Sequence, residues 1–358
     1  MLFSNYKNVK EIWILVNIFM VFTMVIIGGI TRLTDSGLSM TSWALFGGII
    51  PPLDETDWQY YFSLYQNTPE FLIKNFEMNI SEFKKIFFWE YFHRMWGRLV
   101  GLTFLIPLLL LWFKGKFSLY EKKYLTVLLF LGFFQAFMGW FMVESGLVDK
   151  PDVSHFRLSI HLVTAFLIYS MLVFLFWKIK NEYTFKRIPF EFIGNIKLNN
   201  YVFLSIILVL ITVASGAFVS GTDSGLAYNN FPLMDDNVLP PILLENSTSS
   251  ILTLFNDSGF LQFVHRFCAT LTLIIIILTF INNRNSMITA FSKKTLKLLF
   301  YFVIFQYSLG ITILLTYVPT MLGLMHQISS LFILTLLILI HSESKLVISK
   351  VAQNDNLA

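Results

Sequence analysis

Residues 322–341 read LGLMHQISSLFILTLLILIH and contain no Asp, Glu, Lys or Arg. About 20 apolar residues are enough for a helix to cross the hydrocarbon core of a bilayer. Because backbone polar groups cannot stay unpaired in lipid, such a segment is expected to be helical. The other segments of similar length and mostly apolar composition are 12–31, 91–113, 122–143, 156–177, 201–221, 261–281 and 297–317. The sequence therefore predicts an all-α integral membrane protein with eight transmembrane helices.

The composition agrees with a membrane protein. Hydrophobic residues make up 56% of the 358 residues, and charged residues make up 13%, whereas soluble domains carry about 25% charged residues. Cys268 is the single cysteine, which excludes an intrachain disulfide and a zinc site with paired cysteines. Membrane lipid is the expected environment, and no nucleic-acid partner is expected.

The basic residues predict the orientation in the membrane. Seventeen of the 26 Lys and Arg residues lie at the two termini or in the connections after the second, fourth and sixth segments. The stretch 222–260, after the fifth segment, has five acidic residues and no Lys or Arg. Because basic loops stay in the cytoplasm, both termini are expected to be cytoplasmic and the two long loops to face outward.

Two halves of the chain share a pattern of motifs, and internal repeats of this kind are informative about architecture. The matching features, in the same order in each half, are TDSGL at 34–38 and 222–226, PP at 51–52 and 240–241, HR at 93–94 and 265–266, and Gln135 and Gly139 with Gln306 and Gly310. We expect two repeated four-helix bundles, covering residues 1–185 and 186–358. Cofactor sites in bundles form between facing helices.

Four of the six histidines occupy equivalent positions in this repeat: His93, His161, His265 and His326. Each is expected near the outer start of a helix, and a neutral imidazole is a good axial ligand for heme iron. The residues four positions later are all small, Gly97, Ala165, Ala269 and Ser330. They share the histidine's helical face and would leave room for a porphyrin. Two hemes, each with two histidine ligands, are therefore predicted.

Other roles for these histidines stay open. An intramembrane histidine can form a hydrogen bond between helices or belong to a proton relay. A relay does not explain two pairs at one depth. His155 and His341 lack the repeat relation and are expected in a loop and at the inner end of the last helix.

The two halves differ beside the first histidine of each pair. Glu90 precedes His93 by three residues, so both share a helical face, and Gln262 has the same place before His265. A carboxylate can exchange a proton with a substrate, whereas an amide cannot. We therefore expect catalysis in the first half and electron transfer in the second. The alternative for Glu90 is a favourable acid at a helix start.

Four arginines lie near these histidines: Arg94, Arg98, Arg157 and Arg266. A guanidinium can hold a carboxylate with two hydrogen bonds, so these side chains are candidates to bind heme propionates. The alternative is that these arginine side chains extend to the lipid headgroups.

The chain resembles the heme A synthase family along nearly its whole length. The resemblance rests on GGITRLT and SGLSM in the first loop, EYFHR with Gly97 and Arg98, Arg157 with His161, and in the second half on residues 220–227, 230–234, 265–266 and 326–327. It is similar to the alphaproteobacterial and mitochondrial type. The other bacterial type has a cysteine pair in an outer loop, which this sequence lacks, so a redox role for that pair does not transfer.

This resemblance implies oxidation of the C8 methyl group of heme O to a formyl group by successive hydroxylations, which gives heme A for cytochrome oxidase. It implies heme b on His265 and His326 in the second half. It also implies heme O between His93 and His161, with Glu90 essential nearby. A bacterial inner-membrane location follows, as do association with heme O synthase and self-association.

Two other functions fit the residues. One is a membrane electron carrier with two b-type hemes that modifies neither. The other is a transporter built on a repeat, with the histidines as a proton path. Glu90 opposite Gln262 favours an enzyme over the carrier, and bound pigment would exclude the transporter.

Overall fold

The computed structural model describes residues 2–42, 48–148, 151–181, 196–244, 250–284, 286 and 288–355. These residues are mostly helical and include no β-strand, only an isolated bridge between Met234 and Asn237. The long helices are α1 (Leu2–Leu33), α4 (Ile80–Phe113), α5 (Leu119–Leu147), α6 (His155–Asn181), α7 (Ile196–Gly221), α10 (Ser258–Asn283), α11 (Ala290–Leu315) and α12 (Thr320–Asp355). Within the described residues, eight helices are long and apolar enough to cross a membrane, which confirms the predicted count.

Two helix ends differ from the prediction for local reasons. Helix α4 begins at Ile80 rather than near residue 91, because Asn79 and Glu82 form a capping box. Hydropathy detects only the apolar part of a helix. The start of α4 lies before that part, where the cap satisfies the free amides of the first turn. Helix α11 ends at Leu315 rather than 317, since Tyr317 and Val318 adopt positive φ angles of 60° and 55°.

The chain divides into two compact units. The first comprises Met1–Ile18 and Tyr169–Ala358, and the second comprises Phe19–Ile168. Helices α1 and α6 contribute residues to both units, so these units do not follow the expected boundary at residue 185. The assignment of one role to each half, and its description as two repeated bundles, stay predictions.

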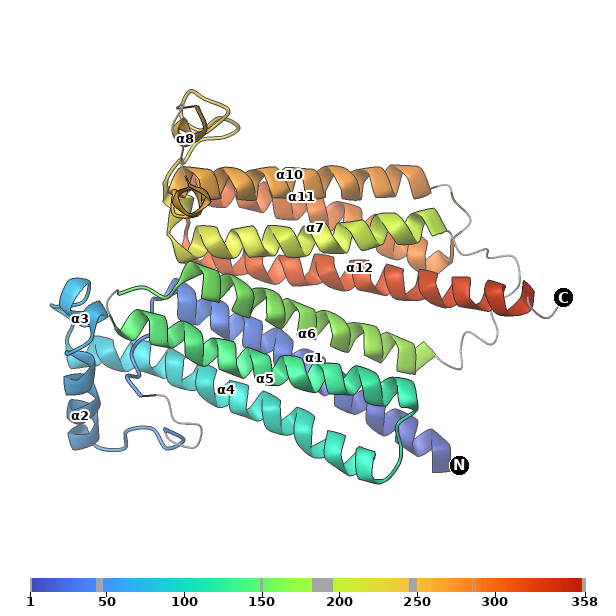
Figure 1. Ribbon diagram of the computed structural model, residues 1–358, viewed down its shortest axis with the longest axis horizontal. Coiled ribbons are helices and arrows are strands. Elements are labelled where there is room, and N and C mark those ends of the chain that lie inside the picture. The colour runs from blue at the N-terminus through green and yellow to red at the C-terminus, as the bar shows by residue number, and fades with distance from the viewer. Residues whose placement is uncertain are drawn as a thin grey trace. The chain divides into compact units, whose positions relative to one another are not determined.

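The first unit contains a closed four-helix arrangement. Helix α7 packs along α10 and α12, and α11 packs along the same two helices (Figure 1). The short segments α8 (Pro241–Leu244), α9 (Ile251–Leu254) and the 3-10 turn η2 (Ser224–Leu226) connect α7 to α10. His265 on α10 and His326 on α12 therefore project from two helices of one bundle.

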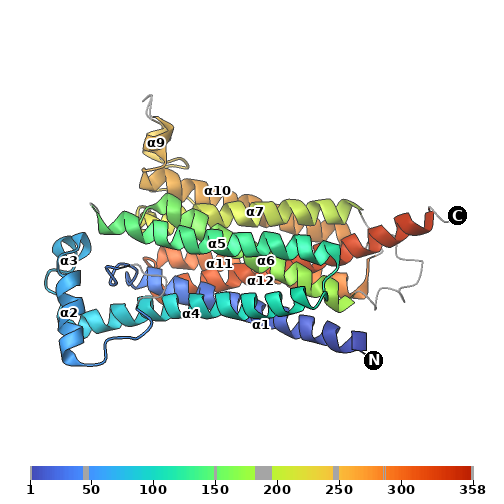
Figure 2. The same ribbon diagram turned by 60° about the horizontal axis from the view of Figure 1, so that its bottom comes forward.

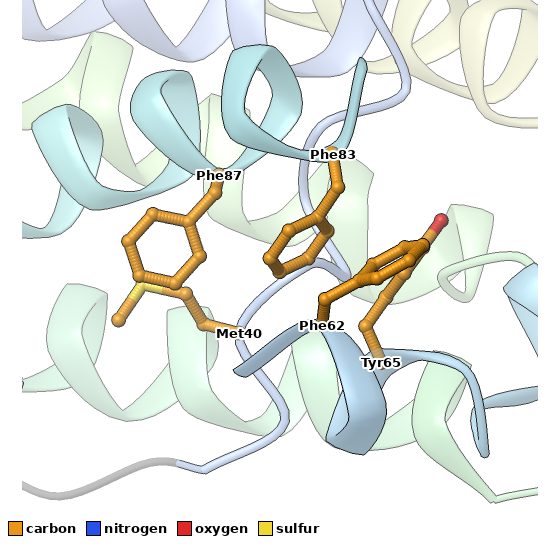
Figure 3. Close-up of a cluster of buried hydrophobic side chains, with 5 residues drawn as sticks. All are labelled: Met40, Phe62, Tyr65, Phe83 and Phe87. Carbon is orange, nitrogen blue, oxygen red and sulfur yellow. The ribbon is translucent and has the colours of Figure 1, made fainter. Parts of the chain in front are cut away.

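The second unit has an additional helical layer, which is formed by the segment that connects α1 to α4 in the sequence. Helix α2 (Glu55–Tyr65) lies across the beginning of α4 (Figure 2), and α3 (Pro69–Ile73) packs against α5. The contact of α2 with α4 is a hydrophobic cluster of Met40, Phe62, Tyr65, Phe83 and Phe87, all buried (Figure 3). The ring of Phe83 lies 5.2 Å, between centroids, from both Phe62 and Tyr65.

Each fully buried aromatic side chain contributes about 1.5–3 kcal/mol to stability. The cluster therefore holds the Met40 segment, which follows α1, against the first turns of α4. This segment also contacts Glu90.

Candidate functional site

Each of the four repeat-related histidines packs against a glycine on a neighbouring helix. A Cβ atom added at Gly28, Gly139, Gly216 or Gly310 would lie 3.2, 3.2, 3.0 or 3.1 Å from Cε1 of His93, His161, His265 or His326, respectively. These distances are shorter than ordinary van der Waals contact. A larger residue at any of these glycines would therefore displace the imidazole.

The small residues four positions after each histidine, expected from the sequence to leave room for a porphyrin, are a different set. Of these, Gly97 lies beside Met24, whose Cε would be 3.4 Å from an added Cβ. Gly139 and Gly310 were visible as repeat positions, but their contact with a histidine was not. Gly28 and Gly216 each lie six residues before a TDSGL motif, so this repeat relation could have identified them as a second pair of glycines.

Two of the histidines have the Nδ1 side of their ring held by a hydroxyl group. His265 Nδ1 lies 3.0 Å from Ser215 Oγ, and Ser215 donates its proton to the carbonyl of Thr212 at 2.8 Å. A hydroxyl has one proton, so Ser215 Oγ accepts from Nδ1–H of His265. The lone pair of this imidazole is then on Nε2, the nitrogen left to bind a metal.

His93 has the same arrangement with a longer contact. Its Nδ1 lies 3.4 Å from Thr31 Oγ1, which donates to the carbonyl of Ile27 at 2.9 Å. The tautomer that this favours again has a free lone pair on Nε2. No sequence signal distinguishes Thr31 or Ser215, because a serine or threonine in an apolar helix usually bonds only to its own backbone.

The other two histidines have a buried Nδ1 atom without a hydrogen-bond partner, in His161 and in His326. Each lies close to a glutamine of the repeat. Gln135 Nε2 is 3.2 Å from His161 Nε2, and Gln306 Nε2 donates to the backbone carbonyl of His326 at 3.0 Å. Because buried polar atoms normally have partners, the Nδ1 atoms of His161 and His326 are available to interact with a ligand.

The second-half pair has a spacing that suits a metal ion between the rings. The ring centroids of His265 and His326 are 6.4 Å apart, and the ring planes are inclined at 71°. A metal bound to one nitrogen of each ring, at about 2 Å from each, places the centroids about 6 Å apart. The observed separation therefore fits two axial ligands on one metal ion.

The ligand set favours heme iron over a bare ion. Among the described residues, no group of three or more His, Cys, Asp or Glu side chains could hold a metal. A structural zinc site uses four protein ligands, whereas heme iron takes its equatorial ligands from the porphyrin and needs only axial ones from the protein. A pair of histidines is therefore a ligand set that suits heme iron.

Glu90 lies well inside α4 and is 3% exposed. One carboxylate oxygen accepts from Ser39 Oγ at 2.7 Å and from the Met40 amide at 2.8 Å, and the other pairs with Arg94. Arg94 also donates to the carbonyls of Met40 and Ser42. The alternative of an acid at a helix start is wrong, because the capping box begins α4 at Ile80.

Gln262 has the corresponding place on α10 and is also 3% exposed. Its amide nitrogen donates to the carbonyls of Gly225 and Tyr228, at 3.2 and 3.1 Å. Arg266 donates to the carbonyls of Tyr228 and Leu233 and to Gln262 Oε1. The same helix-to-loop connection thus occurs twice, with an accepting carboxylate at one site and a donating amide at the other.

The two other candidate arginines have contacts on α5 and on α4. Arg157 stacks on Phe141, with its guanidinium carbon 3.5 Å from the ring centroid, and donates to the Phe141 carbonyl. Arg98 contacts the sulfur of Met95 at 3.2 Å. His155, expected in a loop, is the first residue of α6. The role of the arginines in binding propionates stays a prediction.

A carboxyl group outside the membrane-spanning helices has a shifted pKa. Glu70, at α3, is 4% exposed and accepts from the Tyr65 hydroxyl at 2.9 Å, which in turn accepts from Asn75 at 2.7 Å. Burial raises the pKa of Glu70 to about 7, and burial likewise raises the pKa of Tyr65.

Comparisons with known proteins agree with the resemblance read from the motifs. Residues 11–338 match the family described as "Cytochrome oxidase assembly protein". The heme A synthase of Pelagibacter ubique is 41% identical over 342 residues, covering 93% of this chain and 95% of the relative. The heme A synthases of Flavobacterium johnsoniae and Rickettsia bellii are each 39% identical, covering 90% and 94% of this chain and 94% and 98% of the relatives. This chain therefore belongs to the cytochrome oxidase assembly protein family, together with these heme A synthases.

Proposed function

We propose that this protein is a heme A synthase, which oxidises the C8 methyl group of heme O to a formyl group by successive hydroxylations. The proposal rests on one observation: the histidines of the two halves have similar surroundings but differ in the residue three positions before the first histidine of each pair. Both halves have histidines packed on glycines, but Glu90 accompanies one pair and Gln262 the other. The relatives are named as synthases, and they give no support to an electron carrier that leaves its hemes unmodified.

In the second half, His265 and His326 would hold heme b. Their 6.4 Å centroid separation and the Ser215 contact to His265 Nδ1 support this assignment. Arg266 has a buried Nε atom without a hydrogen-bond partner, which suits a propionate carboxylate. When bound, this cofactor supplies electron transfer, and the protein supplies its position and electrostatic surroundings.

In the first half, heme O would lie between His93 and His161 as the substrate. Glu90 precedes His93 by three residues on α4 and would exchange a proton with the substrate as the methyl group is oxidised. Ser39 donates to Oε2 of Glu90 and Arg94 pairs with Oε1, so the carboxylate is held in one orientation. Arg94, Arg98 and Arg157 are the proposed partners of the propionates.

We propose a location in a bacterial inner membrane, with both termini cytoplasmic. The distribution of basic residues supports this orientation. A reporter enzyme fused after Lys186 should then be active only on the cytoplasmic side, and one fused after Asp236 only outside. Finding both on one side would contradict the proposed topology. We also propose association with heme O synthase, which would supply the substrate, and self-association.

The proposed reaction is tested by identifying hemes by mass. A strain that lacks its own synthase and makes heme O should form heme A when it expresses this protein. A variant with both His93→Ala and His161→Ala is the control and should leave heme O unconverted. Bound heme b without any conversion of heme O would favour the electron carrier. Purified protein without any heme would contradict both proposals.

A further inference from the structure

The same short motif, glutamine followed four residues later by glycine, occurs on α5 and on α11. Gln135 and Gly139 share one face of α5, and Gln306 and Gly310 share one face of α11. In each case the glycine contacts the ring of a histidine on the next long helix, His161 or His326. Helix geometry therefore places each glutamine one turn away from a histidine contact.

The two glutamines bind different atoms of these histidines. Gln135 Nε2 lies 3.2 Å from the ring nitrogen Nε2 of His161. Gln306 donates instead to the backbone carbonyl of His326, at 3.0 Å. The hydrogen bond of Gln306 therefore does not involve the ring nitrogens of His326, whereas that of Gln135 involves Nε2 of His161.

This engagement does not depend on which way the amide of Gln135 is oriented. With its nitrogen toward the ring, the amide donates to the lone pair of His161 Nε2. With its oxygen toward the ring, it accepts a proton from that nitrogen. A metal ligand needs the same lone pair, so Gln135 and an iron atom cannot use His161 Nε2 at once. Nδ1 is the other ring nitrogen, and it is buried without a partner.

The two proposed hemes have opposite requirements. A substrate must leave once it has become product, while a cofactor must stay through many turnovers. We propose that Gln135 competes with the substrate iron for His161 Nε2 and so makes this axial ligand releasable, while Gln306 leaves His326 permanently available. This inference rests on the proposed function. In this role Gln135 is a positioning residue, because it acts through His161.

The inference predicts two rates of heme release. Protein purified with its hemes is mixed with excess apomyoglobin, which captures released heme, and the absorbance change is followed. Wild-type protein should show a fast phase from the first half and a slow phase from the second. A net hydrogen bond changes an equilibrium by about 2- to 10-fold. Because the hydrogen bond to Gln135 would form as the iron leaves, Gln135→Leu should slow the fast phase by up to that factor.

Gln306→Leu is the matched control, because it truncates the equivalent residue without freeing a ring nitrogen. It should leave the fast phase unchanged. An unchanged or accelerated fast phase in Gln135→Leu would overturn the inference, and so would equal slowing by Gln306→Leu. Gln135→Asn is a second variant in case Gln135→Leu does not fold, since its shorter side chain should not reach His161 and should also slow release.

His161→Ala separates this inference from the proposed function. If His161 is a ligand of the substrate heme, His161→Ala should change the absorption spectrum of the fast-released heme. An unchanged spectrum would contradict the proposed ligation itself. A changed spectrum in His161→Ala, together with unaltered release in Gln135→Leu, would contradict only the role of Gln135. Retention of the slow-released heme reports that each variant is folded.

Discussion

The loop after α1 and the loop after α7 are attached to the next long helix by the same pair of positions but with opposite hydrogen-bond polarity. In the first, Glu90 accepts from the Met40 amide and from Ser39. In the second, Gln262 donates to the carbonyls of Gly225 and Tyr228. An arginine four residues later, Arg94 or Arg266, contacts the loop carbonyls in both.

A repeat can thus keep its geometry while its chemistry changes. A carboxylate and an amide have nearly the same shape, so either can connect a loop to a helix. The ionised carboxylate only accepts hydrogen bonds and can take up a proton, whereas the amide donates hydrogen bonds and does not titrate. The reversed polarity of the loop groups around them shows that each site is built for its own side chain.

The largest expected effect is the loss of an axial ligand in the second half. His265→Ala or His326→Ala should remove the six-coordinate low-spin spectrum of heme b, because one of its two protein ligands is lost. Absorption spectra of the purified reduced protein measure this. His155→Ala is the control, since His155 lies at the start of α6 outside the repeat. Persistence of the low-spin spectrum in both ligand variants would place the heme elsewhere.

Glu90→Gln tests the chemical difference between the halves directly. Conversion of heme O should fall by about 10²–10⁴-fold, the usual contribution of a positioned acid or base. Heme O or a hydroxylated intermediate should accumulate, as measured by heme analysis of membranes at matched protein levels. The heme b spectrum should persist, because Gln262 and the second-half histidines are unaltered.

Glu90→Gln would also change the hydrogen bonds at this position. A glutamine at position 90 that keeps its oxygen toward Arg94 would turn its amide nitrogen toward the Met40 N–H, so two donors would face each other. Gln262→Glu is the reciprocal variant, and its carboxylate would face the carbonyls of Gly225 and Tyr228. Normal heme A formation by Glu90→Gln would remove proton transfer by Glu90 from the mechanism.

The glycine contacts predict a smaller effect that should be equal in the two halves. Gly139→Ala and Gly216→Ala each place a Cβ about 3 Å from a histidine ring, and overpacking of this kind costs about 1–3 kcal/mol. Weaker heme retention, measured by heme content after purification, is expected in both. Gly132→Ala is the control on α5, because an added Cβ there meets no atom within 4 Å. An equal loss in Gly132→Ala would mean that the effect is not local.

The smallest expected effect concerns the layer of α2 and α3, which contains the buried carboxyl group of Glu70. Because burial raises the pKa of Glu70 to about 7, the folded state binds a proton more tightly than the unfolded state. The stability of this layer should therefore fall as the pH rises from about 4.5 to about 7.

Amide hydrogen exchange in α2 and α3 measures this dependence. After correction for the intrinsic effect of pH on exchange, protection should be lower at pH 8 than at pH 5. Glu70→Gln should remove the difference, because the amide does not titrate. Glu82→Gln is the control, since Glu82 is exposed and belongs to the capping box of α4. A pH dependence that survives Glu70→Gln would assign it to another group.

Four features can be read from the amino-acid sequence alone: the number of membrane-spanning helices, the repeated motifs, the four histidines and the contrast between Glu90 and Gln262. These features are local: twenty apolar residues must form a helix in lipid wherever the helix lies. The helix starts were harder, because a capping box extends α4 beyond its apolar segment.

The groups that surround each histidine follow from the tertiary structure. Gly216 and Ser215 on α7 meet His265 on α10, and Gln135 meets the ring of His161 while Gln306 meets a backbone carbonyl. Such contacts depend on how each helix is rotated about its axis and on its height relative to its neighbours. Hydropathy does not specify either quantity when most faces of a helix are apolar, so packing between side chains decides them.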